Sequence, residues 1–284
     1  MAQFTNQAQL SYNGAVVNSN VAVGEILEVL SASKTAVMND YTRNDDVTYV
    51  ISVVNSGTSP VTGLTVTDDL GGYAFGAETL YPLEYVEGSV RLYINGVLQA
   101  APTVTAGPPL VFSGITVPAG SNLMIIYEAD VTRFAPLNTD GSIVNTALIA
   151  GAGLPSTVTV TETVVPEQEP ELTITKFIEP VPVTENGTLT YRFLIQNYGN
   201  TEAVATDNVA VSDTFDPILN NLTVTLDGVT LTEPTDYTYD AATGVFATVP
   251  GRITVPAATY VQDETTGAWV ITPGVTELVV TGTV

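Results

Sequence analysis

The feature that most constrains this chain is an internal repeat whose boundaries are out of phase with the chain ends. Five segments of the first copy recur in the same order in the second: 30–34 and 172–176, 48–57 and 190–199, 66–68 and 211–213, 94–97 and 226–229, and 115–119 and 253–257. The second copy carries an insertion at 260–273, which is typical of a hairpin turning at Thr266-Gly267. Two copies of one unit predict two similar domains in tandem.

The repeated segments have the period of two that is typical of β-strands. Runs such as TVTVTETVV and LTVTLDGVTL alternate β-branched residues with polar ones, and Gly and Pro interrupt the chain at short intervals. No long segment has helical periodicity. This pattern predicts an all-β protein of two tandem immunoglobulin-like β-sandwich domains, at 30–166 and 167–284, preceded by an N-terminal hairpin at 1–29.

The second copy ends before its last hairpin. The first copy closes with the segments 143–149 and 156–162, whereas the second stops at 277–284, the equivalent of 123–131. A matching hairpin stands instead at the start of the chain, where 4–10 and 19–25 align with the closing hairpin of the first copy. Its predicted donor-strand residues are Phe4, Asn6, Ala8, Leu10, Val21 and Val23, and Asn6 is predicted to point inward with Phe4, Ala8 and Leu10.

A sandwich without its last two strands leaves an open edge and an exposed core, which proteins avoid. The residues 27–29 between the hairpin and the first repeat span roughly 10 Å, too little to reach the second repeat of the same chain. Donation of the hairpin to repeat 2 of another copy has no such limit, and such contacts build open head-to-tail filaments. The other interpretation is a piece cut from a longer repeat array.

The amino-acid composition excludes several kinds of crosslink, catalytic site and metal site. The chain has no Cys and no His, so disulfides, thiol catalysis, most zinc sites and a Ser-His-Asp triad are excluded. A formal net charge of −23 predicts that neither nucleic acid nor an anionic membrane is a partner. No membrane-spanning run and no signal peptide is visible. We therefore predict a non-enzymatic protein without cofactor, whose partner is a further copy of itself.

Acidic loops also offer oxygen ligands for calcium. The best group is Asp40, Asp45 and Asp46, with Asn39 and Asn44 beside them. Its spacing does not match an EF-hand loop, and a solvated turn is the simpler interpretation.

Several short motifs resemble a bacterial surface family known only as a conserved repeat domain of unknown function. They are Lys34-Thr35 in the first strand, the N-x-G segments 55–57 and 197–199, the V-T/S-D segments ending at Asp68 and Asp213, and the N-x-A segments starting at Asn145 and Asn6. The resemblance covers nearly the whole chain. It implies an immunoglobulin-like fold and an extracellular place on a bacterial cell or spore surface, and it implies nothing about chemistry.

The two lysines of the chain, Lys34 and Lys176, occupy equivalent positions in the two repeats. The repeats also look like the self-crosslinking domains of Gram-positive pili and adhesins, in which a lysine joins an asparagine beside a carboxylic acid. That resemblance implies two candidate groups: Lys34, Asp68 and Asn145 within a chain, and Lys176, Asp213 and Asn6 between chains. The alternative is that both lysines only snorkel at the sandwich edge or form ion pairs.

A second class of function also stays open, a surface adhesin or carbohydrate-binding module. It requires an exposed aromatic cluster. The candidates are Tyr73, Phe75, Tyr81 and Tyr85 in repeat 1, and Tyr237, Tyr239, Tyr260 and Trp269 in repeat 2. Core packing is the commoner role of such residues.

Overall fold

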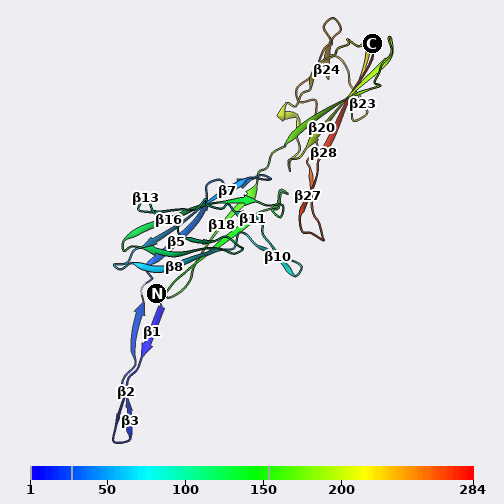
Figure 1. Ribbon diagram of the computed structural model, residues 1–284. Coiled ribbons are helices and arrows are strands. Elements are labelled where there is room, and N and C mark those ends of the chain that lie inside the picture. Colours follow the sequence, from blue (N-terminus) through cyan, green and yellow to red (C-terminus); the bar gives the residue numbers. More distant parts are fainter. Residues whose placement is uncertain (1, 27, 153) are drawn as a thin grey trace. The chain divides into compact units, whose positions relative to one another are not determined.

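The computed structural model describes residues 2–26, 28–152 and 154–284. Contacts divide the chain into two compact units, Met1–Pro136 with Ser142–Val165, and Leu137–Gly141 with Pro166–Val284 (Figure 1). Both are all-β, and the only helix among the described residues is the 3-10 turn η1 (Ala205–Asp207). No helix in these ranges is long and apolar enough to cross a membrane.

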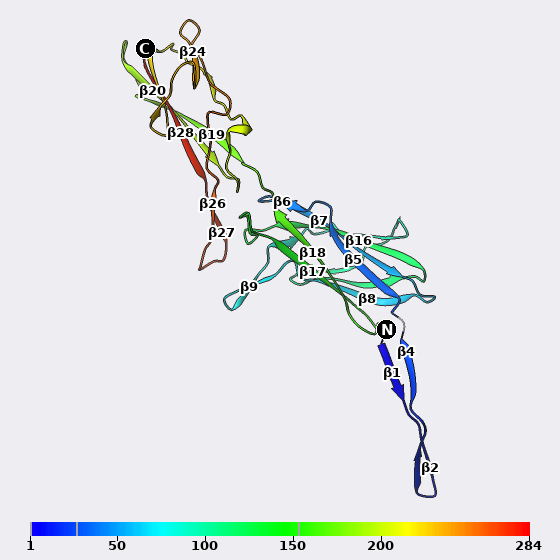
Figure 2. The same cartoon turned by 180° about the vertical axis from the view of Figure 1, so that it is seen from behind.

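The N-terminal segment is a two-part β-hairpin (Figure 2). Its strands are β1 (Ala2–Asn6), β2 (Gln9–Tyr12), β3 (Ala15–Asn18) and β4 (Ala22–Ile26). β1 pairs with β4 and β2 with β3, and no described strand of either sandwich pairs with them. The turn at Asn13 and Gly14 has φ of 45° and 82°, the left-handed pair that an Asn-Gly hairpin turn requires.

The hairpin register shows which side chains of the hairpin share a face. Opposite residues of an antiparallel pair point to the same side, and Asn6 lies opposite Ala22 while Thr5 lies opposite Val23. Val23 is therefore on the face away from Asn6, and Val21 lies between the two strand pairs. The second strand carries one more residue than the first between the two strand pairs, and sequence alignment does not show this extra residue between Asn18 and Ala22.

Repeat 1 is a sandwich of two antiparallel sheets. The first has the order β13-β12-β16-β7-β5, with β11 also pairing β16, and the second has the order β14-β15-β8-β17-β18-β6. A separate pair, β9-β10, completes the unit. The strand bounds are β5 Leu30–Ala36, β6 Asp40–Tyr41, β7 Asp46–Asn55, β8 Val61–Asp68, β9 Tyr73–Phe75, β10 Glu78–Leu80, β11 Leu83–Tyr85, β12 Arg91–Ile94, β13 Val97–Leu98, β14 Thr103–Thr105, β15 Leu110–Val117, β16 Ser121–Val131, β17 Ile143–Ala150 and β18 Val158–Pro166.

The core of repeat 1 follows from the period-two pattern. Alternate residues of β7 and β16 are buried, and Tyr49, Phe112 and Tyr127 are among the largest side chains with almost no exposed surface. The rings of Tyr49 and Tyr127 stack with centroids 5.6 Å apart, and Phe112 lies 5.3 Å from Tyr127. This aromatic group lies under the polar site described below.

Repeat 2 has one complete sheet and one reduced sheet. The first has the order β19-β20-β28-β22-β23, and the second has only β21-β25-β24. A hairpin, β26-β27, occupies the predicted insertion. The bounds are β19 Leu172–Glu179, β20 Thr188–Asn197, β21 Ser212–Thr214, β22 Asn220–Leu226, β23 Val229–Thr230, β24 Tyr237–Asp240, β25 Val245–Thr248, β26 Thr259–Gln262, β27 Trp269–Thr272 and β28 Gly274–Thr283.

The two repeats differ at one edge of the second sheet. In repeat 1, β8 lies between β15 and β17, and β17 pairs with β18. In repeat 2, the equivalent strand β21 pairs with β25 alone among the described strands, so its other edge is open. All-β architecture is thus confirmed, and one edge of β21 is unpaired among the described strands.

Candidate functional site

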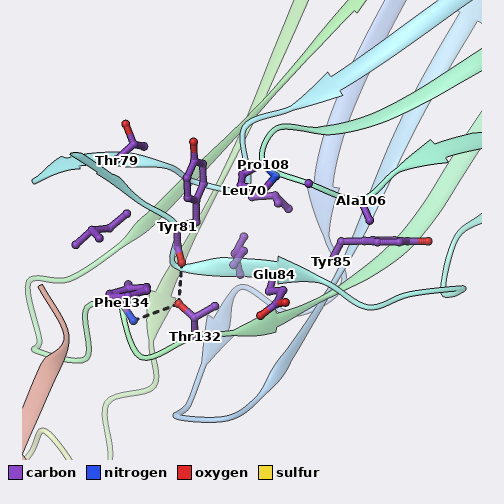
Figure 3. Close-up of a pocket in the computed structure, with 12 residues that line it drawn as sticks. Leu70, Thr79, Tyr81, Glu84, Tyr85, Ala106, Pro108, Thr132 and Phe134 are labelled. Atoms are coloured by element: carbon purple, nitrogen blue, oxygen red, sulfur yellow. Dashed lines mark hydrogen bonds between the residues drawn. The ribbon is translucent and has the colours of Figure 1, made fainter. Parts of the chain in front are cut away.

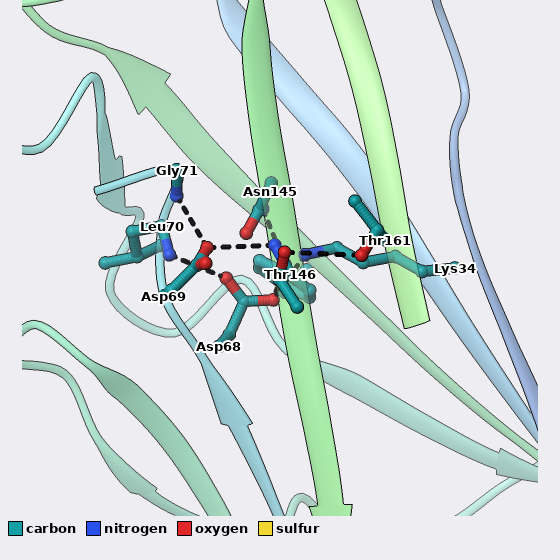
Figure 4. Close-up of polar contacts among 9 residues, drawn as sticks. Lys34, Asp68, Asp69, Leu70, Gly71, Asn145, Thr146 and Thr161 are labelled. Carbon is teal, nitrogen blue, oxygen red and sulfur yellow. Dashed lines mark hydrogen bonds and ion pairs between the residues drawn. The ribbon is translucent and has the colours of Figure 1, made fainter. Parts of the chain in front are cut away.

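Repeat 1 holds a buried ion pair between its two sheets. Lys34 lies on the inner face of β5, Asp68 ends β8, and both side chains have no exposed surface. Lys34 Nζ lies 2.7 Å from Asp68 Oδ2, and it also lies 4.8 Å from the centroid of the Tyr49 ring. Asp68 Oδ1 accepts a hydrogen bond of 3.0 Å from the backbone N–H of Leu70 (Figure 4).

Asn145 on β17 faces the same group. Its side chain is fully buried, and its Nδ2 donates to the Tyr127 hydroxyl at 3.4 Å. The Tyr127 hydroxyl in turn donates to Asp68 Oδ2 at 2.5 Å. Asn145 Oδ1 is buried and has no hydrogen-bond partner. An orphaned buried carbonyl costs about 1–3 kcal/mol, so this amide is held in a state that is unfavourable by itself.

Burial controls the protonation of this group. Removal from water lowers the pKa of Lys34 below its usual 10.5, although the neighbouring Asp68 carboxylate acts in the opposite direction. Burial also raises the pKa of the Tyr127 hydroxyl well above 10.0. A lysine with a lowered pKa has a larger fraction of neutral, nucleophilic amine. The structure therefore brings together the three residues Lys34, Asp68 and Asn145 that the sequence singled out.

Repeat 2 holds the equivalent pair in an open environment. Lys176 forms a very short ion pair with Asp213 and lies 4.5 Å from the centroid of the Tyr191 ring. Its side chain is 42% exposed, whereas that of Lys34 is 0% exposed. The two sites also differ in the strands beside the acid: β17 and β18 continue the sheet beyond β8 in repeat 1, and no described strand pairs with the other edge of β21 in repeat 2.

The strand that carries Lys176 is exposed along its whole length. All eight residues of β19 are exposed, including Ile174 at 55% and Ile178 at 46%. The equivalent positions of β5 are the partly buried alanines Ala32 and Ala36. Large apolar side chains on an uncovered inner face are typical of an interaction site.

The third member of the second group, Asn6, lies on the N-terminal hairpin. It is exposed, as are Phe4 on the same strand, Ala8 between β1 and β2, and Leu10 on β2. The Phe4 ring packs across the strand pair on Gly24, where a Cβ would lie within 2.3 Å of the ring. Asn6 lies in the first compact unit and Lys176 in the second.

The N-x-G asparagines have a structural role that the sequence did not reveal. Asn55 is fully buried, and its amide donates to the carbonyls of Ser59, Val117 and Pro118. Asn197 makes the equivalent bond to the Thr201 carbonyl at 2.7 Å. These amides tie the end of β7 or β20 to the following loop, so the motif specifies the fold.

The calcium candidates form no metal site. No group of three or more carboxylates in the described ranges has the geometry to hold a metal ion. Asp45 instead accepts hydrogen bonds from the backbone N–H groups of Thr42 and Asp46, as an ordinary turn residue does. Across the strands, Asp46 lies opposite Asp130, and their hydrogen bond raises the pKa of Asp130 to about 6.

Two of the aromatic candidates, Tyr85 and Tyr237, are buried in the core, and the other six are partly exposed. In repeat 2, Tyr237 stacks near Phe246 and Tyr239 near Phe215. In repeat 1, Tyr81 and Tyr85 line a pocket of about 370 Å³ (Figure 3). Its other walls include Leu70, Pro108 and Phe134. Among the predicted residues, this pair alone contributes to the described pocket.

Comparisons with known proteins found no matching family model and no matching curated protein. Solved structures do match, all at low similarity. BcpA, the major pilin subunit of Bacillus cereus, is 13% identical, with 96% of this chain and 73% of that chain covered and a TM-score of 0.37. The pilus backbone RrgB from Streptococcus pneumoniae is 12% identical, with 86% and 55% covered and a TM-score of 0.36.

A family 123 glycoside hydrolase from Clostridium perfringens also matches. It is 11% identical, with 49% of this chain and 28% of that chain covered, and its TM-score is 0.30. The chain thus spans little more than half of RrgB and less than a third of the hydrolase. Identities and TM-scores of this size carry no information about activity or partners.

Proposed function

We propose that this chain is the structural subunit of an extracellular bacterial filament, in which the N-terminal hairpin of one copy completes repeat 2 of the next. The observation that carries the proposal is the contrast between the covered and uncovered lysines. Lys34 is buried beneath β17 and β18, while Lys176 and the inner face of β19 are exposed where no such hairpin exists. Phe4, Asn6 and Ala8 match the inward residues of β17.

Repeat 1 supplies the register for this contact. There, Ala147 lies opposite Asp68 and Leu148 opposite Thr67. The same pairing between chains sets Ala8 opposite Asp213 and Gln9 opposite Ser212. Main-chain hydrogen bonds along the open edge of β21 would hold the donor strand, and its alternate side chains would cover β19. Burying the exposed halves of Ile174 and Ile178 contributes about 1 kcal/mol each.

The path of the chain through repeat 1 favours a neighbour over self-closure. The chain enters at Leu30, the first residue of β5, and leaves at Val165, whose N–H donates to the carbonyl of Asn39 beyond the other end of β5. The seven residues of β5 span about 23 Å. A hairpin tethered by residues 27–29 would have to cross this length before it reached its own repeat 2.

The same sites support covalent locking. In the proposed reaction, Lys34 Nζ passes a proton to Asp68, and the neutral amine attacks Asn145 Cγ. The C–N bond to Nδ2 breaks and ammonia leaves with a proton, so an amide replaces the ion pair and Asp68 returns to the carboxylate. Lys176, Asp213 and Asn6 of the next copy would react in the same way between chains. This bond serves where other secreted proteins use disulfides.

Assembly is tested by imaging the purified chain and a variant without residues 2–26. We expect filaments from the chain and monomers from the variant. Adding the parent to the variant should give short capped oligomers, because the variant still accepts a hairpin but donates none. Equal assembly by the variant would contradict hairpin donation.

The second candidate is an adhesin, and the pocket beside Tyr81 and Tyr85 favours it. Aromatic walls of this kind stack on sugar rings or apolar groups. Screening the monomeric deletion variant and its Tyr81→Ala form against immobilised glycans tests the candidate. Binding that Tyr81→Ala abolishes would support it, and absence of binding by the deletion variant would contradict it.

A further inference from the structure

The repeat 1 site contains a hydroxyl that its counterpart in repeat 2 lacks. Tyr127 lies opposite Tyr49 in the β16–β7 pair, and the equivalent residue opposite Tyr191 in the β28–β20 pair is Val280. Both Tyr127 and Val280 are fully buried. The two sites therefore differ in chemistry and not in exposure. Repeat 1 has a tyrosine hydroxyl between the acid and the amide, and repeat 2 has a valine side chain at the equivalent position.

The Tyr127 hydroxyl contacts both partners of the proposed reaction. It lies 2.5 Å from Asp68 Oδ2 and 3.4 Å from Asn145 Nδ2, whereas no hydrogen bond joins Asp68 directly to Asn145 in the described structure. The Asn145 carbonyl oxygen has no partner. A half-turn of the amide about its terminal torsion exchanges the oxygen and nitrogen positions, which brings Oδ1 within reach of this hydroxyl.

We propose that Tyr127 is a catalytic residue of the Lys34–Asn145 crosslink, and that its hydroxyl relays a proton from Asp68 to the asparagine amide. The inference rests on the proposed crosslinking function. After Lys34 gives its proton to Asp68, Asp68 donates to Tyr127 Oη and Tyr127 donates to Asn145 Oδ1, which polarises Cγ for attack. As the tetrahedral intermediate collapses, the departing Nδ2 takes up the two protons that the lysine amine has lost, one of them from Asp68 through the Tyr127 hydroxyl. Asp68 returns to the carboxylate, Tyr127 ends in its original state, and ammonia leaves with a proton.

A different arrangement follows for the site between chains. Val280 cannot relay a proton, so Asp213 must contact the Asn6 amide of the next copy directly. The two crosslinks of one filament should then respond differently to the same substitution, which supplies an internal control.

The rates of both crosslinks are measured after cell-free synthesis of the full chain, by mass spectrometry of the joined peptides at successive times. Tyr127→Phe removes one oxygen atom and should slow the Lys34–Asn145 bond by about 100-fold or more, the usual contribution of a general acid. The Lys176–Asn6 bond should form at the parent rate. Tyr93→Phe is the matched control for the loss of a tyrosine hydroxyl, because Tyr93 lies on β12 opposite Leu98 and Met124. It should leave both rates unchanged.

Trifluorotyrosine in place of Tyr127 distinguishes a proton relay from a purely structural role of this residue. The analogue keeps the ring and the hydroxyl but makes the hydroxyl more acidic. A relay predicts a changed rate of the Lys34–Asn145 bond with unchanged hydrogen-exchange protection of β16. A Tyr127→Phe chain that is folded and crosslinks at the parent rate would overturn the relay and leave the proposed function intact. A parent chain without any Lys34–Asn145 bond would overturn both the relay and the internal crosslink.

Discussion

Removing the carboxylate from the buried ion pair should destabilise repeat 1 strongly. The comparison is Asn145→Ala against Asp68→Ala/Asn145→Ala, because neither variant can crosslink and only the second leaves Lys34 without its partner. Asp68 accepts bonds from Lys34 Nζ at 2.7 Å, from Tyr127 at 2.5 Å and from the Leu70 N–H at 3.0 Å. Breaking one side of a fully buried pair costs about 3–5 kcal/mol, since the remaining charge has no compensation.

The loss should also depend on pH. The pKa of Lys34 is lowered by burial, and loss of the Asp68 charge lowers it further, while the unfolded chain keeps 10.5. Between the two values the unfolded state binds more protons, so the free energy of unfolding of the double variant should rise with pH toward 10.5. The destabilisation is therefore largest near neutral pH and smaller in alkali.

Urea unfolding followed by hydrogen-exchange mass spectrometry of β5 and β17 peptides reports on repeat 1 separately from repeat 2. We expect the midpoint for these peptides to fall, with repeat 2 peptides unchanged. A difference below about 1 kcal/mol at neutral pH, the range of an exposed pair, would refute the assignment of Lys34 and Asp68 as a buried ion pair.

Three further outcomes are expected. Asp130→Asn should stabilise repeat 1 near neutral pH. The pKa of Asp130 is raised from 3.8 to about 6 in the folded chain, so the free energy of unfolding falls as pH rises through this range. Denaturation measured over a series of pH values should show that this slope is absent in the variant. Gly24→Val should displace the Phe4 ring and reduce filament yield by electron microscopy, while a monomer of normal secondary structure forms. Lys176→Ala should remove detergent-resistant ladders on a denaturing gel, whereas Lys34→Ala should keep the ladders and lose only the internal bond.

The sequence was sufficient to predict the fold class because strand periodicity and internal repetition are local signals. Both sandwiches and the insertion hairpin at Thr259–Thr272 follow from aligning one repeat with the other. The group of Lys34, Asp68 and Asn145 came from the resemblance to self-crosslinking domains. The alignment works here because equivalent positions of two similar sandwiches face the same neighbours.

Other features depend on pairing that alignment does not contain. The side of Val23 is one example, because the extra residue between Asn18 and Ala22 places it on the face away from Asn6. Tyr127 was missed because its partner Asp68 lies 59 residues away on the opposite sheet. Aligning the repeats already pairs Tyr127 with Val280. Only the strand register shows that this position lies beside the acid and the amide.

The central claim is that the hairpin of one chain pairs with β21 of another, and a disulfide trap tests it directly. The chain has no cysteine, so two single variants, Gln9→Cys and Ser212→Cys, can be mixed and oxidised. Repeat 1 has its equivalent pair, Leu148 and Thr67, directly opposite each other. A control mixture replaces Ser212→Cys with Thr238→Cys on β24, the other edge of the same sheet.

The account predicts a disulfide-linked heterodimer of the Gln9→Cys and Ser212→Cys chains, and little or none with Thr238→Cys. Equal trapping by the two mixtures would contradict the claim, as would no heterodimer in the first mixture while a single chain carrying both Gln9→Cys and Ser212→Cys closes on itself.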